Sequence, residues 1–404
     1  MTTLAHITTV PVTLDFLDGQ IEFMRSQGFE VTLISSPGPS LERIGLRSGA
    51  ITYPCPMSRN ISPVKDIISL IPLVRLLRRI KPSIVHTHTP KASLLGLFAA
   101  FLVGVPIRIY TVHGLMIETR AGWRQRLLAM MERFICRLSH RVFVVSNTVR
   151  STLEAEGLCP SHKVRMPCHG SCNGINTAKF DPQAVCEETV RKLRLSYHVP
   201  EDAAVIGFVG RVARDKGIAE LASAWAVIRE EYPRAVLMVI GPDEPADEAD
   251  EKIAKRFAQD ERVVRIPWTD EMREHYALFR LLVLPTYREG FPYAILEASA
   301  MALPVVATRV TGCTDAVVDV ETGTLVPPRD AAALTRAIRG YLSDATLCRE
   351  HGMAARVRVE ADFRPEPIWE ALYGEYVQLL QAGGVSAPAI APGEKVADVV
   401  SMRH

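Results

Sequence analysis

Several features that would direct the interpretation elsewhere are absent from this sequence. Its 404 residues carry a formal net charge of only +2, so no strong attraction to nucleic acid is expected. The chain contains 8 cysteines, but none forms a CxxC pair. Cys168 and Cys172 are the closest two, and no nearby histidine pair completes a zinc site around them. We therefore interpret the cysteines as free thiols in a reducing compartment.

Long apolar runs are also scarce. The longest, Ala92–Ile107, is interrupted by glycines, a proline and a serine, and it is shorter than the ~20 residues that a membrane span needs. A buried helix is the better interpretation. The first residues, MTTLAHITTVPVTL, have neither a basic region nor a long apolar core, so no signal peptide is expected. These observations favour a cytoplasmic protein.

The composition and the beginning of the chain indicate the class of fold. Apolar residues make up 48% and charged residues 23% of the sequence, as is typical of globular proteins. A chain of this length favours two domains. A strand over Leu4–Val10, a helix that ends at Gly28 and a strand over Glu30–Ser35 follow one another. This order is how a doubly wound α/β domain with a parallel sheet begins.

The stretch Leu281–Ala300 combines a strand, a loop and a helix. The apolar run Leu281–Pro285 predicts a buried strand, and the composition of YAILEASAMA favours a helix with Pro292 in its first turn. Such a unit places backbone N–H groups and a positive helix end beside an anion. Glu289 in the loop and Glu297 in the helix would accept hydrogen bonds from sugar or ribose hydroxyls.

A second candidate for anion binding follows the apolar strand Ala204–Val209. Gly210 lets the backbone turn closely, Arg211 offers a fork that matches phosphate oxygens, and Lys216 adds a point charge. The helix Ile218–Glu231 comes next. The arrangement G-R-x4-K-G matches neither a P-loop nor the dinucleotide-binding GxGxxG pattern.

The glutamate pair and the G-R-x4-K-G segment together resemble the retaining glycosyltransferases of family 4, and the resemblance covers residues 4–381. It implies the GT-B fold, with two Rossmann-like, doubly wound parallel-sheet α/β domains that face a central cleft. The first domain would comprise residues 1–178 with a crossover helix over 366–381, and the second, which binds the nucleotide sugar, residues 179–365. We expect disorder over 382–404, which is rich in Ala, Pro, Gly and Val.

The resemblance also implies roles for individual residues. The catalytic candidates are His113, which follows the strand Pro106–Val112 and would lie near the donor sugar, and Glu289, which would meet that sugar. A core histidine is the alternative interpretation of His113. Glu297 would hold the ribose. The other donor-binding candidates are Gly210, Arg211, Lys216, Gly290 and Phe291. The candidates on the acceptor side are Gly19, His88 and Lys91.

The segment HTHTPK places His86, His88 and Lys91 where a parallel strand ends and its loop begins. Ligands bind at this edge in open α/β sheets. No third metal ligand with suitable spacing follows, so we prefer an acceptor-side or structural role to a metal site. Neither a metal nor a cofactor other than the nucleotide-sugar substrate is expected.

The segment Gly122–Ser139 has the period of a helix that carries apolar residues among arginines. Its arginines are at positions 124, 126, 133 and 137. Such a helix can lie on an anionic membrane surface, or it can pack into the core with its arginines outside. Both interpretations stay open. A lipid-linked acceptor would favour peripheral attachment to the inner face of the plasma membrane.

The function implied by the resemblance is transfer of a hexose from a nucleotide-diphosphate sugar, with UDP as the preferred nucleotide. The acceptor would be a lipid-linked glycan or polysaccharide in the biosynthesis of a surface polysaccharide such as a capsule or exopolysaccharide. Two alternatives stay open. One is a nucleotide-sugar epimerase of the same fold, and the other is a protein that binds a nucleotide sugar without catalysis. The glutamate pair favours the transferase.

Overall fold

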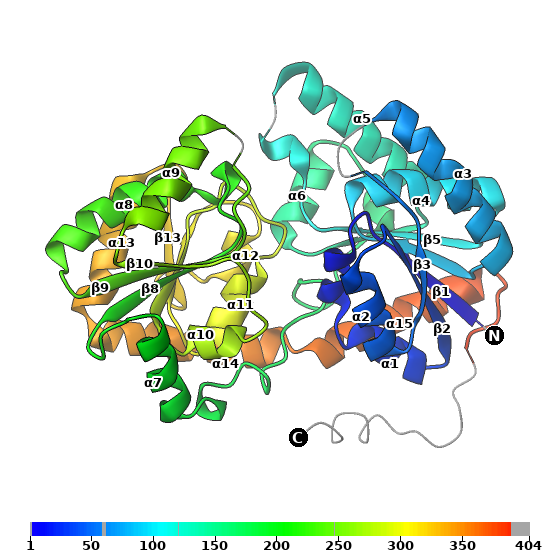
Figure 1. The fold of residues 1–404 in the computed structure, drawn as a ribbon. Helices are drawn as coiled ribbons and strands as arrows, with labels where there is room; N and C mark the ends of the chain where they lie inside the picture. The colour runs from blue at the N-terminus through cyan, green and yellow to red at the C-terminus, as the bar shows by residue number, and fades with distance from the viewer. Residues whose placement is uncertain (1, 59–61, 120, 246, 389–404) are drawn as a thin grey trace. The chain divides into compact units, whose positions relative to one another are not determined.

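The computed structural model describes most of the chain, namely residues 2–58, 62–119, 121–245 and 247–388. The chain divides into two compact units, which are coloured along the sequence in Figure 1. Unit 1 comprises Met1–Asn173 and Pro365–His404, and unit 2 comprises Gly174–Arg364. Most of the C-terminal tail for which disorder was expected, from residue 389 onward, lies outside the described residues.

Unit 1 is built on a seven-stranded parallel sheet with the strand order β3-β2-β1-β4-β5-β6-β7. Its strands are β1 (Thr2–Ile7), β2 (Phe29–Ser35), β3 (Ile51–Pro54), β4 (Ile84–Thr87), β5 (Ile107–Val112), β6 (Arg141–Val144) and β7 (Val164–Arg165). The order reverses between β1 and β4, so the carboxyl ends of these two strands flank a topological switch point.

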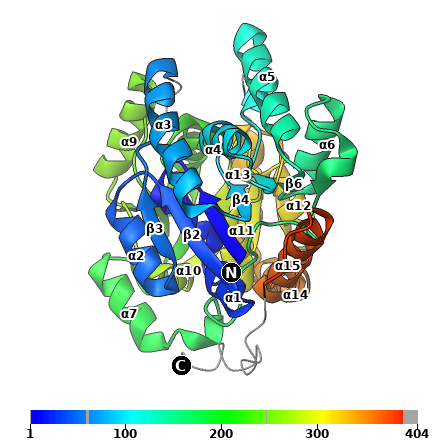
Figure 2. The same ribbon diagram turned by 90° about the vertical axis from the view of Figure 1, so that its right-hand side faces the viewer.

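Helices cover both faces of this sheet, as Figures 1 and 2 show. The helices and 3-10 turns of unit 1 are η1 (Pro11–Leu17), α1 (Gln20–Ser26), α2 (Pro39–Ser48), α3 (Pro63–Ile80), α4 (Pro90–Val103), η2 (Met116–Thr119), α5 (Gly122–Leu138), α6 (Asn147–Ala155), η3 (Ser161–Lys163) and α15 (Pro365–Ala382). Helices α3, α4 and α5 lie side by side, and α1 contacts α15. The long apolar run is largely the buried helix α4, as expected.

Unit 2 is built on a six-stranded parallel sheet with the strand order β10-β9-β8-β11-β12-β13. Its strands are β8 (Ala204–Val209), β9 (Ala235–Ile240), β10 (Val263–Ile266), β11 (Phe279–Leu284), β12 (Val305–Thr308) and β13 (Gly323–Val326). The order reverses between β8 and β11. Both units are therefore doubly wound α/β domains with parallel sheets, as the sequence predicts.

The helices of unit 2 pack on the two faces of its sheet. They are, with the 3-10 turns, η4 (Pro182–Ala184), α7 (Glu187–Ser196), η5 (Arg214–Lys216), α8 (Ile218–Glu231), α9 (Glu248–Gln259), α10 (Met272–Tyr276), α11 (Tyr293–Ala300), α12 (Cys313–Ala316), α13 (Ala331–Ser343) and α14 (Ala345–Asp362). Every strand residue of β9 is buried, which explains its continuous apolar sequence.

Residues 181–202 have the polar, helical composition of a linker between domains, but they do not form one. They belong to unit 2, where the Tyr197 hydroxyl lies 3.0 Å from His275 Nε2. Every residue of α7 is at least partly exposed, so its composition resembles that of a solvated linker. The chain instead changes unit between Asn173 and Gly174, and again between Arg364 and Pro365.

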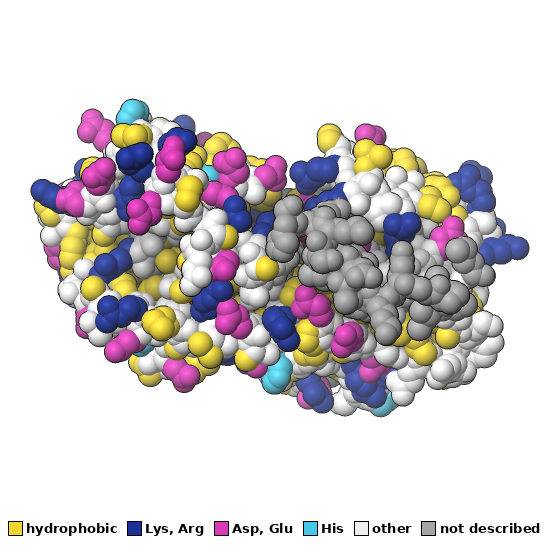
Figure 3. All heavy atoms as spheres, turned by 90° about the horizontal axis from the view of Figure 1, so that it is seen from below, with side chains coloured by type: hydrophobic (Ala, Val, Ile, Leu, Met, Phe, Trp, Pro, Cys, Tyr) yellow, Lys and Arg dark blue, Asp and Glu magenta, His cyan; other side chains and the backbone are white. Residues whose placement is uncertain are grey.

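The surface carries charges of both signs. Lys and Arg side chains are interspersed with Asp and Glu over the face seen in Figure 3, in keeping with the net charge of +2. Among the described helices, none has the length and apolar character needed to cross a membrane.

Candidate active site

The loop after β8 lies close against the end of β9. Gly210 has a φ of 154°, and a Cβ on Gly241 would lie only 2.0 Å from the Gly210 carbonyl oxygen. The Arg211 side chain emerges beside this contact. Its Nη1 donates to Glu244 at 2.7 Å and its Nη2 donates to Asp215 at 3.0 Å. Two carboxylates therefore hold the guanidinium at the carboxyl end of β8.

Lys216 pairs with the first residue of the predicted glutamate pair. Its Nζ donates to Glu289 Oε1 at 2.5 Å, and the two side chains are only 16% and 14% exposed. Gly217 makes this approach possible, because it has a φ of 70° and a Cβ added at this position would lie 1.9 Å from the Pro285 carbonyl oxygen. The glycine of the K-G pair therefore lets the loop after β8 lie directly against the end of β11.

Further hydrogen bonds join the same two loops. The Asp215 carbonyl oxygen accepts from the Tyr287 backbone N–H at 2.8 Å and from the Thr286 hydroxyl at 3.0 Å. Asp215 thus fixes the loop after β11 through its backbone while its carboxylate holds Arg211. The two cationic side chains are positioned by one continuous set of contacts at the switch point of unit 2.

The loop after β12 completes this edge of the sheet. The Glu289 backbone N–H donates to the Thr311 carbonyl oxygen at 3.1 Å. A Cβ on Gly312 would lie 2.4 Å from the Gly290 carbonyl oxygen, so glycine is required for this close approach. Gly290 therefore packs its backbone against the loop after β12, and its donor-binding role stays a prediction.

Helix α11 starts one residue later than predicted. Pro292 has an extended backbone, with φ −77° and ψ 112°, and occupies the N-cap rather than the first turn. Phe291 is only 8% exposed, and its ring lies 5.1 Å from that of Phe363. Its side chain belongs to the core of unit 2, so its backbone is what Phe291 can offer to a ligand.

Glu297 lies within α11 and is half-buried. Burial raises the pKa of its carboxyl group to about 7, although the Tyr276 hydrogen bond and the nearby charge of Lys179 act in the opposite direction. The Tyr276 hydroxyl donates to Glu297 Oε2 at 2.8 Å. Tyr276 was missed from the sequence, because only folding brings the end of α10 against α11.

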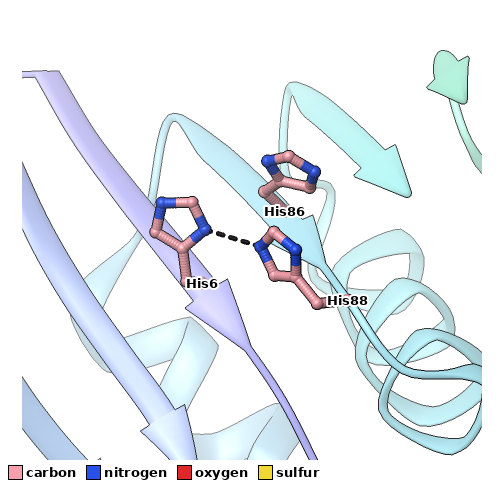
Figure 4. Close-up of side chains that lie close together, drawn as sticks. All are labelled: His6, His86 and His88. Atoms are coloured by element: carbon pink, nitrogen blue, oxygen red, sulfur yellow. Dashed lines mark hydrogen bonds between the residues drawn. The ribbon is translucent and has the colours of Figure 1, made fainter. Parts of the chain in front are cut away.

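Unit 1 places a group of histidines at its own switch point, shown in Figure 4. His6 on β1 and His86 on β4 are direct partners in the parallel register, and His88 follows two residues after His86. His6 Nδ1 lies 2.8 Å from His88 Nε2. His86 Nδ1 lies 2.6 Å from the Tyr376 hydroxyl, and its Nε2 lies 2.6 Å from the Thr111 hydroxyl. These three histidines are buried.

His113 extends the group from the end of β5. Its Nε2 lies 3.5 Å from His88 Nδ1, and its ring centroid lies 6.1 Å from that of Phe16. Burial lowers the pKa of His113 to about 4 and that of His6 to about 3. It also lowers the pKa values of His86 and His88. The four imidazoles are therefore neutral near pH 7.

The three histidines on β1, on β4 and directly after β4 have the spacing of a metal site but not its geometry. One nitrogen from each of His6, His86 and His88 lies within 4.8 Å of the others. Both nitrogens of His86 are already hydrogen-bonded. The 2.8 Å separation of His6 and His88 is also shorter than the roughly 3.3 Å expected between two ligands of a tetrahedral zinc. The arrangement fits a hydrogen-bonded cluster.

The acceptor-side candidates of unit 1 have structural roles in the folded chain. Gly19 has a φ of 76°, and its Cβ would lie 2.5 Å from the Trp369 ring of α15. Lys91 Nζ lies 2.6 Å from Asp66 of α3, and the lysine is 7% exposed. His88 is buried beside His6. His6 itself was missed, because a lone histidine within a strand gives no signal until the strand register is known.

Comparison with known proteins agrees with this architecture. Residues 17–169 match the family model described as glycosyl transferase 4-like domain, and residues 203–344 match that of glycosyl transferases group 1. The capsular polysaccharide biosynthesis glycosyltransferase CapM of Staphylococcus aureus is 35% identical over 377 residues, which span 93% of this chain and 97% of CapM. The chain therefore belongs to the group 1 and family 4-like glycosyltransferases, and it is an enzyme of this class.

Two other relatives extend the comparison. The UDP-Gal:alpha-D-GlcNAc-diphosphoundecaprenol alpha-1,3-galactosyltransferase of Escherichia coli is 27% identical, over 85% of this chain and 89% of its own length. The fold is similar to that of an Anabaena protein solved in complex with UDP and glucose. The TM-score is 0.78 at 15% identity, over 94% of this chain and 100% of that one. The fold class is GT-B.

Proposed function

We propose that this glycosyltransferase moves a hexose from a UDP-linked donor to a lipid-linked glycan, with retention of the anomeric configuration, during synthesis of a surface polysaccharide. The observation that carries the proposal is the group of charged side chains at the switch point of unit 2. There Arg211 lies beside Asp215 and Lys216 beside Glu289, at the edge of the sheet where α/β domains bind their ligands.

The reaction requires stabilisation of a leaving diphosphate. The acceptor hydroxyl oxygen bonds to the anomeric carbon, the bond from that carbon to the phosphate oxygen breaks, and the hydroxyl proton passes to the departing diphosphate. Negative charge builds up on the diphosphate as the bond breaks. Arg211, Lys216 and the N-terminus of α11 stabilise this charge, a contribution worth about 3–4 kcal/mol of barrier in comparable sites. No enzymic nucleophile takes part.

The carboxylates around the two cations have a second role in this proposal. Asp215 and Glu244 hold Arg211, and Glu289 holds Lys216, so both cations are oriented before the donor arrives. The diphosphate then replaces carboxylate oxygens as the partner of these cations. Glu289 becomes available to the hydroxyls of the donor sugar, Glu297 accepts from the ribose, and His113 contacts the sugar, as the family pattern implies.

The donor and acceptor are proposed from the relatives. The name of the E. coli relative gives UDP-Gal as its donor and a diphosphoundecaprenol-linked sugar as its acceptor. The name of the S. aureus relative gives capsular polysaccharide biosynthesis. These names support a UDP-sugar and a lipid-linked saccharide as the substrates of this chain.

The experiment that tests the proposal is an incubation of the purified enzyme with a panel of UDP-hexoses and a lipid-linked saccharide fraction. We expect transfer that depends on the acceptor and is lost by orders of magnitude in the Arg211→Ala/Lys216→Ala double variant. Arg214→Ala is the matched control, because Arg214 lies in the same turn but pairs with Asp247. Near-normal turnover of the double variant would remove the diphosphate assignment.

The same incubation separates the alternatives to transfer. An epimerase would convert the nucleotide sugar in the absence of an acceptor, and a non-catalytic protein would bind it without turnover in either arm. Membership of the glycosyltransferase family favours neither. Conversion of the nucleotide sugar into its epimer without an acceptor would exclude the transferase proposal.

We also propose that α5 attaches the enzyme to anionic lipid. Trp123, Met130 and Phe134 are 69%, 60% and 40% exposed. Arg124 and Arg126 are exposed on the same helix. An exposed apolar strip beside arginines is the arrangement with which an amphipathic helix binds an anionic membrane surface. Attachment would keep the enzyme beside a lipid-linked acceptor.

Sedimentation with vesicles of anionic and of neutral phospholipid tests this attachment. Arg133 is left unchanged, because it donates to the carbonyl oxygens of Glu156 and Gly157 and supports the fold. We expect a Trp123→Ser/Arg124→Ser/Arg126→Ser variant to lose binding to anionic vesicles. The control variant Lys252→Ser/Lys255→Ser, on α9 of unit 2, should bind as the wild type does. Equal binding of all three proteins would refute the proposal.

A further inference from the structure

We propose that His88 and His6 are positioning residues that fix the tautomer of His113, so that its ring carries the proton on Nδ1 and presents an N–H donor on the side away from His88. The inference rests on the proposed function for the role of His113 toward the sugar. The tautomer itself does not depend on the proposed function, because it follows from the hydrogen bonds within unit 1.

The three rings form a chain of nitrogens. His6 Nδ1 lies 2.8 Å from His88 Nε2, and His88 Nδ1 lies 3.5 Å from His113 Nε2. Burial lowers the pKa of each of the three rings, so each is a neutral imidazole with one N–H and one acceptor nitrogen. Two N–H groups cannot face each other at these distances without repulsion. The protons along the chain must therefore all point the same way.

Two directions are possible, and the end of the chain at His6 decides between them. The His6 side chain is 0% exposed, and among the described residues its Nε2 has no hydrogen-bond partner. A buried N–H without a partner is less tolerable than a buried acceptor without one. His6 therefore carries its proton on Nδ1 and donates to His88 Nε2. His88 in turn carries its proton on Nδ1 and directs it at His113 Nε2.

The direction of the chain determines what His113 can do. With Nε2 facing the N–H of His88, the proton of His113 lies on Nδ1. A neutral ring that donates from Nδ1 can hydrogen-bond to a sugar oxygen without carrying a positive charge. Without this constraint His113 would be a mixture of tautomers, and its Nδ1 would be a donor in some molecules and an acceptor in others.

His86 is not part of this chain. Its two nitrogens face the hydroxyls of Tyr376 and Thr111, each at 2.6 Å. Removal of the Tyr376 hydroxyl therefore disturbs a neighbouring ring at the same depth without touching the three rings of the chain. Tyr376→Phe is for this reason the matched control.

Long-range proton–nitrogen NMR of the full chain labelled with ¹⁵N-histidine measures the tautomers directly. We expect His6, His88 and His113 all to be in the Nδ1–H form, opposite to the Nε2–H form that a free imidazole side chain favours. An Nε2–H resonance for His113 in the wild type would overturn the proposal. Because the spectrum needs neither donor nor turnover, its failure is distinguishable from failure of the proposed function.

Variants of His88 test whether the chain causes the tautomer. In His88→Gln the amide takes the place of Nε2 and retains a polar contact with His6, but the nitrogen that faced His113 is gone. We expect His113 to move to the Nε2–H form in this variant and to stay in the Nδ1–H form in Tyr376→Phe. A His88→Leu variant with the same shift would confirm the result should the glutamine variant fail to fold. An Nδ1–H form of His113 in the folded His88 variants would refute the positioning role.

Discussion

Replacement of Lys216 by methionine separates the structural role of this residue from its proposed catalytic role. In the folded chain Lys216 Nζ lies 2.5 Å from Glu289 Oε1, and the side chains are 16% and 14% exposed. Lys216→Met leaves the Glu289 carboxylate in this partly buried place without its cation. Because loss of one partner of a fully buried pair costs 3–5 kcal/mol and this pair keeps some exposure, we expect a loss of about 2–3 kcal/mol.

The expected loss is large enough to measure. Unit 2 spans Gly174–Arg364, and for a domain of that size 1 kcal/mol shifts the midpoint of thermal unfolding by about 2–4 °C. The transition of unit 2 should therefore fall by about 4–12 °C in Lys216→Met. Turnover should also fall by about 10²–10³-fold, because one cation that faces the departing diphosphate has been removed.

The double variant Lys216→Met/Glu289→Gln distinguishes the two effects. Conversion of the carboxylate to an amide removes the unpaired charge, so stability should return toward that of the wild type. Turnover should stay low, because the cation is still missing and the Glu289 carboxylate proposed to meet the donor sugar is now an amide. Scanning calorimetry and a transfer assay on the same preparations measure both quantities. Recovery of turnover together with stability would mean that Lys216 serves only the fold, and the reasoning would be refuted.

Three further predictions follow from the geometry of unit 2. Burial raises the pKa of Glu297 in the folded chain from 4.5 to about 7. As pH rises between these values, Glu297 loses its proton in the unfolded chain but keeps it in the folded chain, so the free energy of unfolding falls. Chemical denaturation should show this slope in the wild type and lose it in Glu297→Gln. UDP affinity, measured by calorimetry, should strengthen more steeply as pH rises through about 7 in the wild type than in Glu297→Gln. The carboxylate is the better acceptor for ribose hydroxyls, whereas ionisation of the terminal phosphate of UDP contributes equally to both proteins. Gly217→Ala should destabilise unit 2 by about 2–4 kcal/mol in a denaturant titration, because the added Cβ would lie 1.9 Å from the Pro285 oxygen at a φ of 70°. The control variant Gly340→Ala should be neutral or stabilising, because its Cβ meets no described atom within 4 Å.

Much of the fold could be predicted from the sequence because its signals are local. Continuous apolar runs mark buried parallel strands, and helix Ile218–Glu231 has the predicted bounds. In a parallel sheet the loop after each strand lies at one edge, so Arg211 and Glu289 could be placed at the same edge before any strand order was known.

The contacts within the site could not be predicted, because they depend on which strands are neighbours. Lys216 reaches Glu289 only because β8 pairs with β11, and His6 reaches His88 only because β1 pairs with β4. The spacing of apolar residues in the sequence does not show which strands pair. The polar stretch 181–202 is ambiguous for a different reason, since a helix without buried residues and a linker have a similar composition.

A crystal structure of the wild-type enzyme with UDP tests the central claim most directly. The account predicts that the oxygens of the terminal phosphate lie within hydrogen-bonding distance of Lys216 Nζ and of the Arg211 guanidinium, with the ribose against Glu297. UDP bound elsewhere, or a diphosphate that both cations leave unpaired while they keep their carboxylate partners, would contradict it.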